Sequence, residues 1–125
     1  MDKKKVLLVD DETDFIMIMG KRIKHWGYEL LTASNGKEGL EAVEQKHPDL
    51  VVLDYMMPEM DGVATLKEIR KVNKEIPVIM LTAFPNKASI EGTEKLGVSA
   101  YIPKLGMFGS VEASLKAAVE MVLKK

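Results

Sequence analysis

The sequence has no cysteine, no long apolar run and no excess of charge of either sign. Without cysteine, neither a disulfide framework nor a thiolate metal site can form, and a reducing compartment suits such a chain. The 18 Lys and Arg residues nearly balance the 19 Asp and Glu residues. The chain therefore lacks the excess of positive charge that is typical of proteins dedicated to binding nucleic acid or anionic membranes. No apolar run approaches the roughly 20 residues of a membrane-spanning helix. We therefore expect a cytoplasmic protein with no membrane insertion and no direct nucleic-acid binding.

The chain length predicts one domain. A chain of 125 residues and 13.9 kDa can bury its own core without covalent staples. The apolar stretch near the N-terminus covers only Val6 to Val9 and ends in acids, which does not predict a secretory signal. No repeat, low-complexity segment or linker divides the sequence. We expect a single domain over residues 1–125, which either acts alone or was cut from a longer protein.

Short apolar runs alternate with longer amphipathic stretches along the whole chain. This pattern is typical of repeated strand–helix units around a parallel sheet that is buried on both faces. The apolar runs predict strands near residues 5–9, 29–32, 50–53, 77–80 and 100–102. The amphipathic stretches predict helices near residues 13–26, 36–46, 62–72, 86–96 and 109–123. The fourth helix should be short or mobile, because Ser89, Gly92 and Thr93 lower its helix propensity.

Turn and cap residues mark the ends of three predicted helices. Gly27 stands where the first helix should end, and Ser34 or Asn35 can cap the second. The third helix follows Asp61-Gly62. These residues support the predicted boundaries.

Polar residues follow the apolar part of four predicted strands. The runs VLLVDD, LVVLD, VIMLT and AYIPK close with Asp10-Asp11, Asp54, Thr82 and Lys104. In an open α/β sheet, ligands and chemistry gather at the carboxyl ends of the strands, so these ends should converge on one cleft. Carboxylates, a hydroxyl and a lysine in one cleft are the groups that an acyl-phosphate site needs.

Asp54 is the candidate nucleophile of this cleft. It ends a fully apolar run and precedes a turn-rich loop, YMMPEMDG. A carboxylate is a weak nucleophile toward phosphorus unless a divalent cation neutralises the phosphoryl charge and aligns the attack. Asp10 and Asp11 are suitable ligands, and the backbone carbonyl of Met56 could supply another.

Thr82 and Lys104 offer donors that carboxylates cannot. A hydroxyl can donate to a phosphoryl oxygen, and an ammonium neutralises the same group. Taken alone, each candidate has a simpler explanation: a strand-end Asp is commonly a turn former or helix cap, Thr is a good strand former and Lys is usually a solvated charge. The coincidence of all of them at one end of successive strands favours function.

The runs VLLVDDE, DLVVLDYMMPEMDG, VIMLTA and AYIPK resemble the receiver domain of two-component response regulators, over essentially the whole chain. The resemblance implies a flavodoxin-like α/β fold: a doubly wound, five-stranded parallel sheet in the order 2-1-3-4-5, flanked by five helices. It also implies that Asp54 is the phosphoacceptor. Mg²⁺ or Mn²⁺ would be held by Asp54, Asp11 and the carbonyl of Met56, with Asp10 supporting the metal through its waters or directly.

The same resemblance implies a signalling switch. A phosphohistidine on a sensor histidine kinase or a histidine phosphotransfer protein would donate its phosphoryl group to Asp54. Thr82 matches the family's switch hydroxyl, Lys104 its phosphate-binding lysine and Tyr101 its switch aromatic. The surface of the fourth helix, last strand and fifth helix would then change and control a downstream protein. Such a chain is no enzyme in its own right, although it takes part in its own phosphorylation and dephosphorylation.

The sequence departs from the receiver pattern at two places. Leu105 follows Lys104, where receivers typically have a proline with a cis bond, and the proline here is Pro103. A cis bond before a residue other than proline costs roughly 3–4 kcal/mol, so we expect a trans bond at Leu105 or a strained loop. The second departure is Phe84-Pro85, whose proline stiffens the loop after Thr82 and can set the start of the fourth helix.

Two other classes of protein use comparable residues or the same fold. Haloacid-dehalogenase-like phosphatases also use an Asp nucleophile with Mg²⁺, but theirs ends the first strand and a second Asp follows two positions later, where this chain has Glu12. A non-catalytic interaction module is the third class. Met17 should point away from the core and Ile16 should lie at the edge of the apolar stripe, as scattered surface residues or as part of a docking site for a helical partner.

Overall fold

The computed structural model describes residues 3–57, 60–83, 87–104 and 108–124. Five strands form one parallel sheet: β1 (Lys5–Val9), β2 (Glu29–Ala33), β3 (Leu50–Asp54), β4 (Val78–Thr82) and β5 (Ala100–Pro103). The strand order is β2-β1-β3-β4-β5, with every neighbouring pair parallel. The predicted fold and strand order are therefore confirmed.

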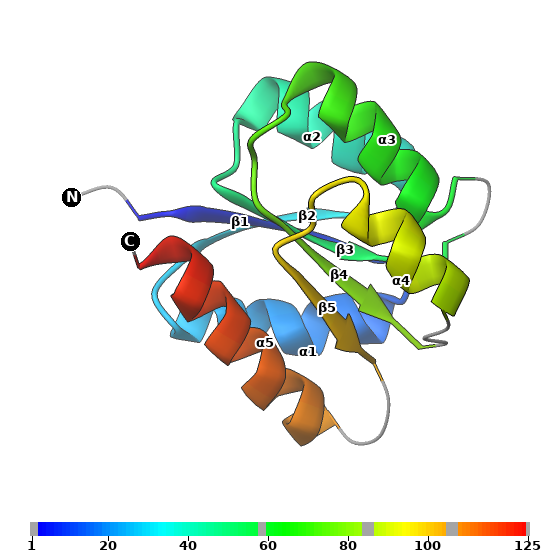
Figure 1. Ribbon diagram of the computed structural model, residues 1–125. Coiled ribbons are helices and arrows are strands. Elements are labelled where there is room, and N and C mark those ends of the chain that lie inside the picture. Colours follow the sequence, from blue (N-terminus) through cyan, green and yellow to red (C-terminus); the bar gives the residue numbers. More distant parts are fainter. Residues whose placement is uncertain (1–2, 58–59, 84–86, 105–107, 125) are drawn as a thin grey trace.

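The helices cover both faces of this sheet. They are α1 (Thr13–His25), α2 (Gly36–Lys46), α3 (Gly62–Val72), α4 (Lys87–Glu94) and α5 (Phe108–Leu123). In Figure 1, α1 and α5 lie on one side of the sheet, and α2 and α3 lie on the other, with α4 beside α3. At 8 residues α4 is short, as predicted. None of the helices in the described chain combines the length and apolar character needed to cross a membrane.

Alternate residues of each strand feed two separate cores, which explains why the strands read as continuous apolar runs. Val6 and Leu8 of β1 pack in the cluster under α1 and α5, whereas Leu7 and Val9 pack in the cluster under α2 and α3. The side chains of all four are fully buried. Two packed faces hold the sheet rigidly, so the residues at its carboxyl edge are well positioned.

The predicted caps fix where α2 and α3 begin. Asn35 accepts a hydrogen bond from the Glu38 backbone N–H at 2.8 Å, and Asp61 accepts one from the Ala64 N–H at 2.8 Å. Gly27 follows α1 with φ of 101°, a conformation that favours glycine. These contacts confirm Asn35, one of the two candidates, as the cap of α2.

Candidate functional site

The polar strand ends meet at the carboxyl edge of the sheet, as predicted. Asp10 and Thr82 are fully buried, and Asp54 is 3% exposed. A cleft of about 260 Å³ opens at this edge, over Asp54. Its lining residues are Asp11, Glu12, Asp54, Met56, Ala83 and Lys104.

Asp54 ends β3 with its carboxylate inside this edge. Burial raises its pKa to about 7, and the negative charge of Asp10 acts in the same direction. Lys104 and a long hydrogen bond of 3.4 Å from the Met56 N–H oppose the shift. The carboxylate is thus poorly solvated, and a cation beside it would favour its charged form.

Asp10 follows the last residue of β1, and its carboxylate lies beside that of Asp54. One of its oxygens accepts a hydrogen bond from the Glu12 backbone N–H at 2.8 Å, and the other accepts one from the Lys104 ammonium at 2.7 Å. Burial raises the pKa of Asp10, while these two donors lower it. Two buried carboxylates therefore share the positive charge of one lysine.

Lys104 reaches the site from the residue after β5. Its side chain is 8% exposed and pairs with Asp10, with Glu12 and, at 3.7 Å, with Asp54. The ammonium also lies 4.2 Å from the centroid of the Phe15 ring, a cation–π contact. Burial alone would lower the pKa of Lys104, but the hydrogen bonds to Asp10 and Glu12, together with the negative charges of Asp10 and Asp54, outweigh it and raise the pKa.

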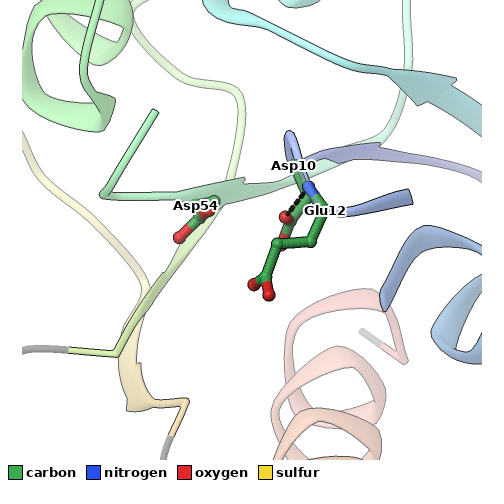
Figure 2. A group of neighbouring side chains, drawn as sticks. All are labelled: Asp10, Glu12 and Asp54. Atoms are coloured by element: carbon green, nitrogen blue, oxygen red, sulfur yellow. Dashed lines mark hydrogen bonds between the residues drawn. The ribbon is translucent and has the colours of Figure 1, made fainter. Parts of the chain in front are cut away.

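A hard cation could be held by carboxylates in this cleft. Asp10, Glu12 and Asp54 each offer an oxygen within 4.8 Å of the others, and Figure 2 shows the three side chains together. Carboxylate oxygens are the ligands that Mg²⁺ prefers, and the buried negative charge of Asp10 and Asp54 fits a divalent cation. Asp11 is exposed and lies outside this trio, although it lines the same cleft and its charge raises the pKa of Asp54.

Glu12 was not among the site residues that we predicted. Its side chain pairs with Lys104 from the solvent side of the cleft. The available signal was a third acid directly after Asp10-Asp11, a position from which a long side chain can reach back over the strand ends.

Of the remaining predicted residues, Met56 lines the cleft, whereas Thr82 and Tyr101 are not among its lining residues. Thr82 ends β4, and its backbone carbonyl accepts a hydrogen bond from the Lys104 N–H. Tyr101 on β5 is half-buried and packs against the cluster under α2 and α3. The Met56 side chain is exposed after β3. The predictions for Leu105, Phe84 and Pro85 fall outside the described residues.

Comparisons of the sequence with known proteins find relatives in one family. A family model described as "Response regulator receiver domain" matches residues 6–116. A probable transcriptional regulator, ycf27 of Cyanophora paradoxa, is 42% identical over 118 residues, which cover 94% of this chain and 48% of that protein. The transcriptional regulatory protein ZraR of Escherichia coli strain K12 is 36% identical over 118 residues, 94% of this chain and 27% of its own length. The chain thus spans about half, or less, of these relatives.

Solved structures share the fold of this chain. The chemotaxis protein CheY4 of Vibrio cholerae superposes with a TM-score of 0.87 and 26% identity, over 97% of this chain and 99% of that one. The Francisella response regulator 1452 receiver domain gives a TM-score of 0.79 and 30% identity, over 94% and 98% of the two chains. The family model covers most of the chain, and the chain belongs to the response regulator receiver domain family.

Proposed function

We propose that this chain is a phosphorylation-dependent signalling switch with Asp54 as phosphoacceptor. The observation that carries the proposal is the buried Asp54 carboxylate at the carboxyl edge of the sheet, beside Asp10 and within 3.7 Å of the Lys104 ammonium. The phosphoryl donor would be a phosphohistidine on a sensor histidine kinase or a histidine phosphotransfer protein, because the chain belongs to the receiver domain family.

The proposed reaction is a direct transfer between two side chains. An Asp54 oxygen attacks phosphorus, a P–O bond forms, the P–N bond to the partner's imidazole breaks, and the imidazole leaves. Asp10, Asp11, Asp54 and the carbonyl of Met56 would hold Mg²⁺. When bound, the ion neutralises charge on the phosphoryl oxygens. Lys104, whose ammonium lies 3.7 Å from Asp54, would neutralise charge on the same group.

Switching would follow from the donors that the new group attracts. A protein phosphate carries roughly −1.5 to −2 charges, enough to draw in the Lys104 ammonium and the Thr82 hydroxyl. As Thr82 moves inward, Tyr101 could rotate into the space it leaves. This rotation would change the surface of α4, β5 and α5, and with it the affinity for a downstream protein.

We further propose that the domain is no multiple-turnover enzyme, acts in the cytoplasm and makes no direct contact with nucleic acid. Asp54 ends the third strand, whereas dehalogenase-like phosphatases carry the nucleophile on the first. The near balance of charge supports the absence of nucleic-acid contact. Steady turnover of small phosphate esters would contradict the first point, and salt-dependent retention on duplex DNA would contradict the last.

The phosphoacceptor is tested by Mg²⁺-dependent labelling with acetyl phosphate. We expect wild type to gain one phosphoryl group that hydroxylamine removes, as an acyl phosphate requires, and Asp54→Asn to gain none. Asp61→Asn is the matched control, because Asp61 is an exposed helix cap and Asn caps equally well. Hydroxylamine-sensitive labelling that persists in Asp54→Asn would place the acceptor elsewhere.

A further inference from the structure

The Lys104 ammonium is already engaged in this structure, and one of its partners is a residue outside the proposed phosphorylation chemistry. It donates to Asp10 at 2.7 Å and to Glu12, and it lies 3.7 Å from Asp54, beyond hydrogen-bond length. Asp10 and Glu12 thus hold the ammonium in the unphosphorylated protein. A phosphoryl group on Asp54 would compete with these two carboxylates for the same positive charge.

The two present partners differ in how easily they can release the lysine. The Asp10 carboxylate is fully buried, so losing Lys104 would leave an unpaired charge in the interior. The Glu12 side chain is 62% exposed, so water can replace Lys104 around its carboxylate at small cost. Glu12 is thus the partner that Lys104 leaves most easily.

The backbone is held in place at the point where the Glu12 side chain begins. Its N–H donates to Asp10 at 2.8 Å, which holds the start of α1 against the strand end, as the dashed line in Figure 2 shows. The carboxylate therefore extends over the cleft from a fixed anchor. It approaches Lys104 from the solvent side, whereas Asp10 holds the lysine from the protein interior.

We propose that Glu12 is a positioning residue that holds Lys104 in the unphosphorylated protein and competes for it with a phosphoryl group on Asp54. The inference rests on the proposed function of Asp54 and Lys104. It predicts that Glu12 lowers the affinity of the site for a phosphoryl group. A metal ligand at position 12 would have the opposite effect, because its loss would weaken metal binding and phosphoryl binding together.

The test measures binding of beryllofluoride, an analogue of the phosphoryl group, by calorimetry at saturating Mg²⁺. We expect Glu12→Gln to bind beryllofluoride about threefold more tightly than wild type, the effect typical of one exposed ion pair. Asp14→Asn removes an exposed acid from the same end of α1 and should bind as wild type does, since Asp14 is not among the ion-pair partners of Lys104 in the described chain. Unchanged or weaker binding by Glu12→Gln would overturn the inference.

A second pair of variants separates the contact from general charge. Glu12→Asp keeps the charge but is one methylene shorter, and we expect it to tighten binding as Glu12→Gln does. Lys104→Met removes the partner of Glu12. In this background Glu12→Gln should therefore change beryllofluoride affinity by less than about 1.5-fold, because the effect of Glu12 depends on its pair with Lys104. Wild-type behaviour of Glu12→Asp, or a persistent effect without Lys104, would contradict competition for the lysine.

The outcomes for wild type distinguish this inference from the proposed function. If wild type neither binds beryllofluoride nor takes a phosphoryl group from acetyl phosphate, the proposed function fails and the inference fails with it. If wild type does both and Glu12→Gln matches it, only the role of Glu12 is wrong.

Discussion

At the level of single residues, the site gathers more buried negative charge than it neutralises. Asp10 and Asp54 are both buried, and burial raises the pKa of each. Lys104 is the buried cation beside them in the described chain. Without metal, the folded protein therefore holds a carboxylate that would be better solvated in the unfolded chain, and folding stability should depend on pH.

The pH dependence has a definite sign. The pKa of Asp54 is about 7 when folded and close to 3.8 when unfolded. Between these values the folded state binds more protons than the unfolded state, so the free energy of unfolding falls as pH rises. The difference corresponds to at most about 4 kcal/mol. We expect Asp54→Asn to match wild type near pH 4 in EDTA and to exceed its stability by a few kcal/mol at pH 8, measured by urea denaturation.

Two further measurements make this prediction specific to Asp54. Asp61→Asn should follow wild type at every pH, because it removes an exposed carboxylate and preserves the cap. Mg²⁺ at pH 8 should reduce the difference in free energy of unfolding between wild type and Asp54→Asn, because a cation that binds the folded wild-type protein stabilises it by mass action. If the difference in free energy of unfolding does not depend on pH, neighbouring groups already neutralise the Asp54 charge in the folded protein.

Residue by residue, the sequence located the site better than it described its contacts. Asp10, Asp54, Thr82 and Lys104 were placed correctly at one edge, because strand ends in a parallel sheet converge wherever the apolar runs end. The sequence could not show which of Asp10 and Asp11 faces inward, since that depends on how the chain leaves β1. The Glu12–Lys104 pair depends on the rotamer of an exposed side chain, which no spacing determines.

At the level of elements, Gly62 determines how closely α3 approaches the end of β3. A Cβ built at Gly62 would lie 2.6 Å from the Tyr55 Cα and 2.7 Å from the Asp54 carbonyl oxygen. The Gly62 N–H also donates to the Tyr55 carbonyl at 2.8 Å. The start of α3 is therefore packed directly against the backbone that carries Asp54, the proposed phosphoacceptor.

Gly62→Ala should destabilise the fold because the clashing atoms belong to backbone, which cannot rotate away. We expect a loss of about 2–3 kcal/mol in the free energy of unfolding, as for overpacked cores. Gly92→Ala in α4 is the matched control: its nearest neighbour is Val63 Cγ2 at 3.9 Å, so alanine should be neutral or stabilise by up to about 1 kcal/mol. If Gly62→Ala and Gly92→Ala change the free energy of unfolding equally in urea denaturation, α3 can shift away from β3.

Arg70 links α3 to two connections on the same side of the sheet. Its guanidinium donates to the carbonyl of Leu96 at 2.8 Å and of Gly97 at 3.2 Å, just after α4, and to that of Ile76 at 2.8 Å, before β4. The sequence did not indicate this role, since an Arg on an amphipathic helix normally points into solvent. Helix α4 is short, and this clamp lies close to its C-terminal end.

Arg70→Lys should therefore weaken the end of α4. A single ammonium cannot reproduce the forked contacts of a guanidinium, so the part-buried carbonyls of Leu96 and Ile76 lose donors and stability falls by about 1–3 kcal/mol. Lys71→Ala removes an exposed pair with Glu68 and should cost less than about 0.5 kcal/mol. Hydrogen exchange should locate the loss in α4 and the segment after it. Faster hydrogen exchange over the whole chain, rather than at the end of α4, would contradict a local role of Arg70.

For the molecule as a whole, the proposed switch connects the cleft at the carboxyl edge of the sheet to the surface of α4, β5 and α5. Thr82 and Pro103 are partners in the β4–β5 register, and Tyr101 lies two residues before Pro103 on the same strand. Tyr101 packs with Leu96 and Val98 against the cluster under α2 and α3. Any inward movement of Thr82 therefore acts on a strand that also carries Tyr101 and borders the segment after α4.

Tyr101→Ala should separate phosphoryl uptake from the response of that surface. The side chain lies outside the cleft-lining residues, so we expect beryllofluoride affinity within about twofold of wild type, whereas amide chemical-shift changes in α4 and α5 on binding should shrink markedly. Tyr28→Ala, which removes a half-buried aromatic from the opposite core, should keep both properties. Parallel loss of affinity and response in Tyr101→Ala would mean that Tyr101 supports the site itself, and the path from Thr82 to the α4, β5 and α5 surface would then have to run through other residues of the sheet.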